Sequence, residues 1–166
     1  MDILSHGLYG GVLVGRKSRR SFWLAFFFGI APDLFSFGIF TASVWLGLAS
    51  GLDWGSRHPD PSLIPSYVQS LYNVTHSLVI WTLVFALVWI VYRKLPWVLG
   101  AWGLHILCDI PTHSTRFFPT PFLWPFNTPY VNGIPWARPT FMIANYALLA
   151  LTYLGIHRYK VIKSRR

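Results

Sequence analysis

Acidic residues are scarce in this sequence, which contains five aspartates and no glutamate. Charged residues make up 11% of its 166 residues, whereas an average soluble domain has about 25%. The single cysteine, Cys108, excludes an internal disulfide and fits a helix-packing role better than that of a nucleophile. The shortage of charge therefore argues against a water-soluble domain.

Long apolar runs take the place of charge. Residues 22–52 contain one charged residue, Asp33, and residues 78–92 and 140–156 contain none. A helix that crosses a bilayer needs about 20 mostly apolar residues. We predict one all-α domain, residues 1–166, forming an integral membrane bundle of about four transmembrane helices plus a short N-terminal embedded helix. The predicted helical segments are residues 3–15, 21–49, 67–92, 95–110 and 139–159, with a kink at Pro32.

The net charge of +9 invites a nucleic-acid interpretation, but the positions of the cations argue against it. They cluster at residues 16–20, 93–94 and 158–166, in the gaps or at the ends of the apolar segments. Cytoplasmic loops of membrane proteins carry such clusters. We therefore expect a multi-pass protein of the inner membrane with these clusters in the cytoplasm. Its expected partner is membrane lipid, not nucleic acid.

Several ionisable residues lie where apolar helices are predicted. They lie in or at the ends of these segments and are His6, Asp33, His76, His105, Asp109 and His113. Such groups are costly in a membrane and usually pair with something. His105, Asp109 and His113 are four residues apart, so they share one helix face if the helix continues past Pro111. Imidazole nitrogen and carboxylate oxygen are standard zinc ligands.

These residues are also expected to lie at a similar depth in the membrane. Counted from the basic clusters at about 1.5 Å per residue, His6, Asp33, His76, His105 and Asp109 lie roughly 15–26 Å into the membrane. Five ionisable residues from four segments thus share one band in its outer half. This pattern predicts a metal site. Structural hydrogen bonds between helices and a proton relay are the alternatives.

The motifs around these residues resemble the YdjM-type (DUF457) family of membrane-bound metal-dependent hydrolases. The matching stretches are Ser5-His6-Gly7-Leu8-Tyr9-Gly10, Ala31-Pro32-Asp33-Leu34, Val74-Thr75-His76-Ser77-Leu78, His105-Ile106-Leu107-Cys108-Asp109 and Phe122-Leu123-Trp124-Pro125-Phe126. They cover most of the chain in the family's order. One departure lies just before the Thr-His-Ser motif, where many members have a His-Arg-Gly-like stretch and this chain has Leu71-Tyr72-Asn73-Val74.

That family is distantly similar to zinc-dependent phospholipases C and P1-type nucleases. The resemblance implies that Asp33, His76, His105 and Asp109 hold one divalent metal, expected to be zinc. It implies that His6, with Asp109 as a bridge, holds a second, and that His113 completes the His-Asp-His run. The soluble enzymes also use a Glu and an N-terminal amine. This chain lacks Glu and its Met1 is expected to be badly placed, so we expect one or two ions.

The expected activity is hydrolysis of a phosphodiester or lipid headgroup by a metal-activated water, with Asp33 and Asp109 as catalytic residues. Arg116 and Arg138 are candidate phosphate contacts, or else solvated loop charges. Three hydroxyl side chains are candidates to orient imidazoles, or else to cap helices: Thr75, Ser77 and Thr112. The rival function is a non-catalytic metal or proton carrier, or a structural membrane protein, that uses the same cluster.

Overall fold

A computed structural model of the chain describes residues 1–51, 61–127 and 129–164. These residues form helices and no strand, which confirms the predicted all-α class. Residues 52–60, between the predicted helices 21–49 and 67–92, and residues 165–166 of the basic cluster 158–166 lie outside the described residues. The elements are α1 (Ile3–Tyr9), η1 (Gly10–Val14), α2 (Arg19–Asp33), η2 (Leu34–Gly38), α3 (Ile39–Trp45), η3 (Pro61–Leu63), α4 (Ser66–Thr75), α5 (Leu78–Tyr92), η4 (Trp97–Leu99), α6 (Gly100–Thr112) and α7 (Pro139–Ser164).

Two of the described helices are long and apolar enough to cross a membrane. They are Arg19–Trp45, which joins α2, η2 and α3, and Pro139–Tyr159 within α7. A third span exists if α4 and α5 are counted together, although they meet at 57°. The expected count of about four is therefore not confirmed, and α6, with 13 residues, reaches only about 20 Å. The first segment, Ile3–Val14, is a shorter apolar helix, as expected.

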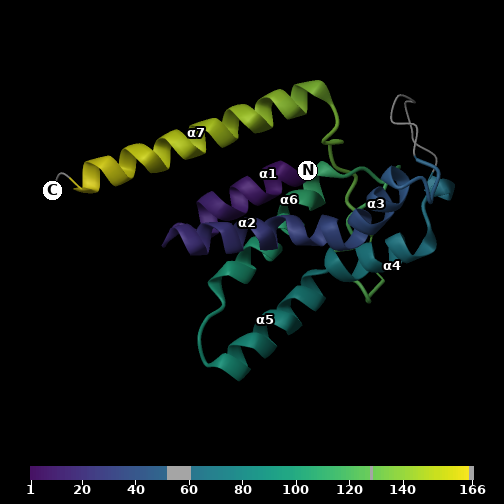
Figure 1. Cartoon of the computed structure of the whole chain (residues 1–166), viewed down its shortest axis with the longest axis horizontal. Coiled ribbons are helices and arrows are strands. Elements are labelled where there is room, and N and C mark those ends of the chain that lie inside the picture. Colours follow the sequence, from purple (N-terminus) through teal and green to yellow (C-terminus); the bar gives the residue numbers. More distant parts are fainter. Residues whose placement is uncertain (52–60, 128, 165–166) are drawn as a thin grey trace.

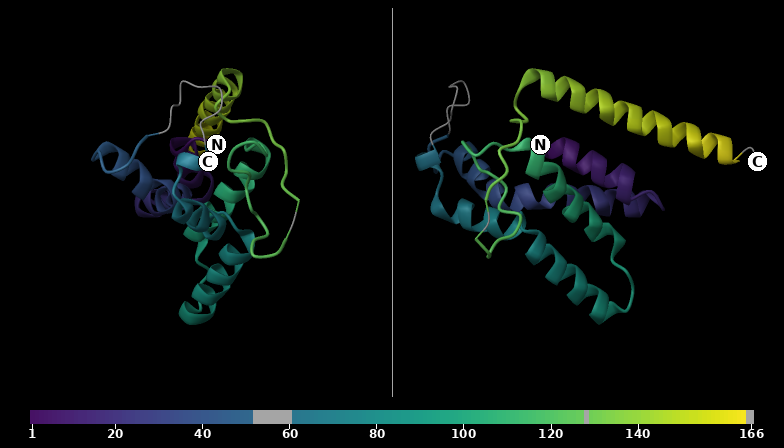
Figure 2. Two further views of the ribbon diagram at one scale, coloured as in Figure 1. Left: turned by 90° about the vertical axis from the view of Figure 1, so that its right-hand side faces the viewer. Right: turned by 180° about the vertical axis from the view of Figure 1, so that it is seen from behind.

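The surface of these helices is apolar. Large hydrophobic side chains are exposed along α2, α5 and α7, among them Trp23, Phe27, Leu83, Leu87, Ile143 and Leu151. Exposed apolar area of this extent is unusual for a soluble monomer and fits contact with lipid. The start of α2, the turn after α5 and the C-terminal end of α7 lie toward the same end of the molecule (Figures 1 and 2). These three places carry the basic clusters.

Glycines allow α1 to lie directly against α2. A Cβ atom added at Gly29 would lie 2.6 Å from the carbonyl oxygen of His6, and one at Gly10 would lie 2.7 Å from that of Ala25. Small residues serve this purpose between membrane helices because they let two backbones approach closely. The helix α6 packs against α2 as well, so the three helices form one layered centre while α7 runs alongside (Figure 1).

The predicted helix 67–92 is wrong in one respect, because it breaks at His76 and Ser77. The Ser77 hydroxyl oxygen accepts hydrogen bonds from the backbone N–H groups of Val79 and Ile80 and so caps α5. The same hydroxyl donates to the carbonyl of Trp124. Ser77 therefore has the capping role that sequence analysis left open. At Pro32, in contrast, the helix continues, with the π-helical turn η2 directly after it.

The contact at Gly29 predicts a matched pair of stability effects. Gly29→Ala places a methyl group against the His6 carbonyl, and overpacking of this kind costs about 1–3 kcal/mol. Gly155→Ala in α7 meets nothing within 4 Å. In detergent, thermal unfolding should shift down by roughly 2–10 °C for Gly29→Ala. Gly155→Ala should unfold at or slightly above the wild-type temperature, and equal shifts in both variants would refute this account of the packing.

Candidate metal centre

Four side-chain atoms from three parts of the fold converge in the buried centre. Asp33 lies at the end of α2, His76 at the break between α4 and α5, and His105 and Asp109 one turn apart on α6. The Nε2 atoms of His76 and His105 are 3.1 Å apart. Asp109 Oδ2 lies 3.2 Å from His105 Nε2 and 3.6 Å from His76 Nε2. Asp33 Oδ1 lies 3.4 Å from His76 Nε2 and 3.8 Å from His105 Nε2.

These separations fit a four-coordinate metal ion. Tetrahedral zinc binds nitrogen and oxygen ligands at about 2.0–2.1 Å, which places neighbouring ligand atoms about 3.3 Å apart. The five separations run from 3.1 to 3.8 Å, and all four atoms lie within 4.8 Å of one another. The His/Asp group is thus within metal-binding distance without movement of any helix.

Backbone carbonyl groups fix the direction in which each imidazole presents its lone pair. His105 Nδ1 lies 2.7 Å from the carbonyl oxygen of Gly29, and His76 Nδ1 lies 3.2 Å from that of Tyr72. A carbonyl oxygen only accepts hydrogen bonds, so each Nδ1 carries a proton, and in the neutral imidazole each Nε2 is left as an acceptor. The Thr75 hydroxyl oxygen lies 3.0 Å from His76 Nδ1 as well, as expected of a residue that orients the imidazole.

The converging atoms therefore repel one another unless a cation lies among them. His76 is fully buried, and His105 and Asp109 are each 1% exposed. Asp109 Oδ2 has no hydrogen-bond partner among the described residues. A buried carboxylate that faces two acceptor nitrogens is strongly unfavourable. One divalent ion satisfies all four atoms at once, whereas a proton on one imidazole satisfies only one pair.

The second oxygen of Asp109 faces a different set of groups. Asp109 Oδ1 lies 2.9 Å from His6 Nε2 and 3.5 Å from His113 Nε2. The His6 contact has the distance of an ion pair, yet neither ring nitrogen of His6 makes an aligned hydrogen bond. The His6 ring stacks on that of His105, with centroids 3.6 Å apart. All six residues predicted from the sequence thus lie together, joined by Asp109.

Met1 is better placed than the sequence suggested. Its amine donates to Asp109 Oδ1 and to Thr112 Oγ1, which is 3.1 Å away, and lies 3.3 Å from His113 Nε2. Met1, which was expected to be badly placed, therefore lies within the cluster. Thr112 accepts from this amine and donates to the Cys108 carbonyl, so it does not orient an imidazole.

His113 reaches the cluster although it is not helical. The helix α6 ends at Thr112, and His113 has an extended backbone, so the expected helix face does not include it. Its Nδ1 lies 2.8 Å from the carbonyl of Phe118, which points Nε2 toward Asp109. The segment 133–136 holds this helix end. Its N–H groups donate to two carbonyls at the end of α6 and to that of His113, in the pairs Ile134–Pro111, Trp136–Thr112 and Gly133–His113.

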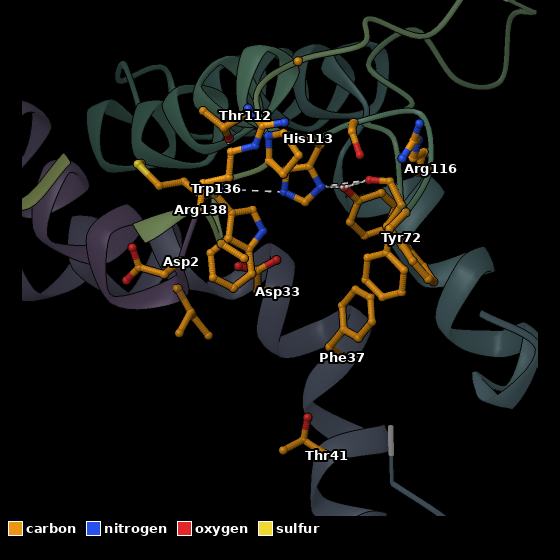
Figure 3. A pocket seen from close by; sticks show the side chains of 18 of the residues that line it. Asp2, Asp33, Phe37, Thr41, Tyr72, Thr112, His113, Arg116, Trp136 and Arg138 are labelled. Atoms are coloured by element: carbon orange, nitrogen blue, oxygen red, sulfur yellow. Dashed lines mark hydrogen bonds between the residues drawn. The ribbon is translucent and has the colours of Figure 1, made fainter. Parts of the chain in front are cut away.

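One side of the cluster opens into a cavity of about 1230 Å³. Asp33, whose side chain is 20% exposed, and His113 lie on its wall. Arg116 and Arg138, the two predicted phosphate contacts, line the same cavity. Figure 3 shows Asp33 and His113 near each other, with Phe37 along the helix that leads away from them. The cavity gives the buried cluster a route of access.

Tyr72 was not predicted from the sequence, but it packs against the site. Its ring stacks on that of His76, with centroids 3.8 Å apart, and its hydroxyl donates to the Phe118 carbonyl. The one available signal was its position four residues before His76.

Comparisons of this chain with family models, curated proteins and solved structures found no match. The geometry of the site is therefore the main support for its function.

The geometry predicts how much metal the purified protein binds. We expect at least one divalent ion per chain, measured by mass spectrometry of the metal content. His105→Ala and Asp109→Asn should retain less than a tenth of it, because each removes one of four ligand atoms. His157→Ala, which changes an exposed histidine of α7 outside the cluster, should bind as wild type does. Folded variants with unchanged metal content would contradict the assignment.

Proposed function

We propose that this chain is an integral membrane hydrolase that depends on a divalent metal, expected to be zinc, and cleaves a phosphodiester in or near a lipid headgroup. One observation carries the proposal: two imidazole Nε2 atoms and two carboxylate oxygens converge within 4.8 Å of one another. The proposed ligands of the first ion are Asp33, His76, His105 and Asp109. The YdjM-type resemblance of the motifs supports the same assignment.

An ion in this cluster would lower the pKa of a coordinated water toward neutrality and polarise the scissile bond. Asp33 suits the role of ligand or base on the substrate side, because it is the member of the group of four that lines the cavity. In hydrolysis the water oxygen bonds to phosphorus and the ester P–O bond breaks. The proton of the water passes to Asp33 and then to the leaving alkoxide.

The opposite oxygen of Asp109 offers a second position. His6 and His113 present Nε2 atoms to Asp109 Oδ1, which the Met1 ammonium also contacts. A second ion that shared the Asp109 carboxylate with the first would therefore displace the Met1 ammonium or bind its deprotonated amine. Bridging carboxylates are common where two ions act on one phosphate, since two cations stabilise both the attacking and the leaving oxygen. We therefore propose one or two ions, with Asp109 essential to both.

The arginines of the cavity supply charge of the right sign for the substrate. Arg116 and Arg138 line the cavity whose inner end is Asp33 and His113. A guanidinium group binds phosphate oxygens through paired N–H donors, so this placement suits a phosphodiester.

The proposal includes an orientation in the inner membrane. The three basic clusters face the cytoplasm, and the site lies in the outer half of the membrane.

Activity assays separate the hydrolase from a carrier that uses the same cluster. Protein in mixed micelles should hydrolyse bis(p-nitrophenyl) phosphate or a member of a phospholipid panel, and a chelator should abolish turnover reversibly. Asp33→Asn and His105→Ala should each lower kcat/KM at least 100-fold, while His157→Ala should not. A metal-loaded protein that releases no product but moves the metal across vesicle membranes would show the carrier to be correct.

A further inference from the structure

One wall of the cavity is a continuous face of a candidate membrane span. Four residues of η2 and α3 line it at a helical spacing of three to four residues: Leu34, Gly38, Thr41 and Trp45. From Asp33 to Trp45 the helix rises about 18 Å, which exceeds half of the roughly 30 Å hydrocarbon core of a bilayer. The cavity is thus long and follows the helix away from the metal cluster (Figure 3).

The opposite wall is mostly aromatic and apolar. It comes from the segments after α6 and before α7 and includes Phe117, Phe118, Pro135 and Trp136. Trp136 and Asp33 both line the cavity and are labelled in Figure 3. An apolar cavity of this length is suited to a hydrocarbon chain, because burial of each CH₂ group contributes about 0.8 kcal/mol. A small water-soluble phosphodiester would fill only its polar end.

Positively charged side chains line this cavity. Arg116 and Arg138 line it, and neither takes part in an ion pair within residues 1–51, 61–127 and 129–164. Two carboxylates line the cavity as well, but both are engaged. Asp2 accepts from the Ser5 N–H and the Tyr146 hydroxyl, and Asp33 belongs to the metal cluster. The arginines are therefore available to an anionic ligand.

We infer that this cavity binds a membrane phospholipid, with one acyl chain along the helix face from Leu34 to Trp45 and the phosphate near Arg116, Arg138 and Asp33. The inference rests on the proposed function for its chemistry, and it names the substrate class of the same site. An amphiphile with an anionic head matches both the apolar walls and the two arginines that line the cavity. The helix face from Leu34 to Trp45 belongs to the candidate span Arg19–Trp45.

Gly38 controls the width of the cavity at its middle. A Cβ atom added there would meet only the Leu34 side chain, at 3.8 Å, which is ordinary van der Waals contact. The backbone at Gly38 has φ −61°, so the helix itself does not require glycine. The missing side chain leaves the cavity open at this position. A large residue at 38 should therefore fill the cavity without disturbing the helix.

Photo-crosslinking tests this inference independently of turnover. The full chain is reconstituted in vesicles of phosphatidylethanolamine and phosphatidylglycerol that contain a phosphatidylglycerol with a photoactivatable acyl chain. Wild-type protein should crosslink chiefly within residues 34–45 and 117–136. Gly38→Trp should lose at least ten-fold of this signal, whereas Gly38→Ala and Gly155→Trp should keep it. Gly155 is the matched control, because it lies on the exposed surface of α7 with nothing within 4 Å.

The outcomes distinguish the inference from the proposed function. Metal content and thermal unfolding are measured first, to check that Gly38→Trp is folded. If wild type hydrolyses both substrates and Gly38→Trp lowers the ratio of activity on long-chain phosphatidylglycerol to activity on bis(p-nitrophenyl) phosphate at least ten-fold, both claims stand. Crosslinks lost in Gly38→Trp without hydrolysis of any substrate by wild type would remove the function and keep the lipid site. Crosslinks spread evenly over the surface, or unchanged in Gly38→Trp, would overturn the lipid site.

Discussion

The hydrogen bonds from His105 and His76 to backbone carbonyls determine the chemistry of the whole centre. Because Gly29 and Tyr72 accept from the Nδ1 atoms, both Nε2 atoms point inward as acceptors. The carboxylates of Asp33 and Asp109 face the same point. In a buried environment, acceptors that face each other without a donor raise the free energy of the folded state. A cation reverses the sign of this interaction, so metal binding and stability of the fold should be linked.

The fold meets this constraint through close contacts between short helices. The carbonyl of Gly29 accepts from His105, and the missing side chain of the same residue lets His6 approach from α1. On the other side of the centre, the break between helices α4 and α5 turns the His76 imidazole toward the cluster. A continuous helix would point this side chain in a different direction. Ser77 stabilises that break by capping α5. Gly29 and Ser77, two small residues that are not ligands themselves, thus help to bring the ligands together.

The sequence predicted the membership of the cluster better than its architecture. Helical spacing related His105 to Asp109, and depth related both to His76 and Asp33, since the rise of a helix converts residue number into height. The break at His76 could not be predicted in this way. It depends on the carbonyls of Phe122 and Trp124, more than 40 residues away, to which Leu78 and Ser77 donate. The expected count of about four spans is not confirmed among the described residues, and hydropathy does not reveal where a segment bends.

Metal coordination is the central claim, and X-ray absorption at the edge of the metal that purifies with the protein tests it most directly. The account predicts a first shell of nitrogen and oxygen at about 2.0–2.1 Å with the multiple-scattering signature of two or more imidazoles. His157→Ala should give the same spectrum, and His105→Ala should lose both imidazole signal and metal. A sulfur ligand, which would have to come from Cys108 or a methionine, or a folded protein that binds no divalent metal at all, would contradict the account.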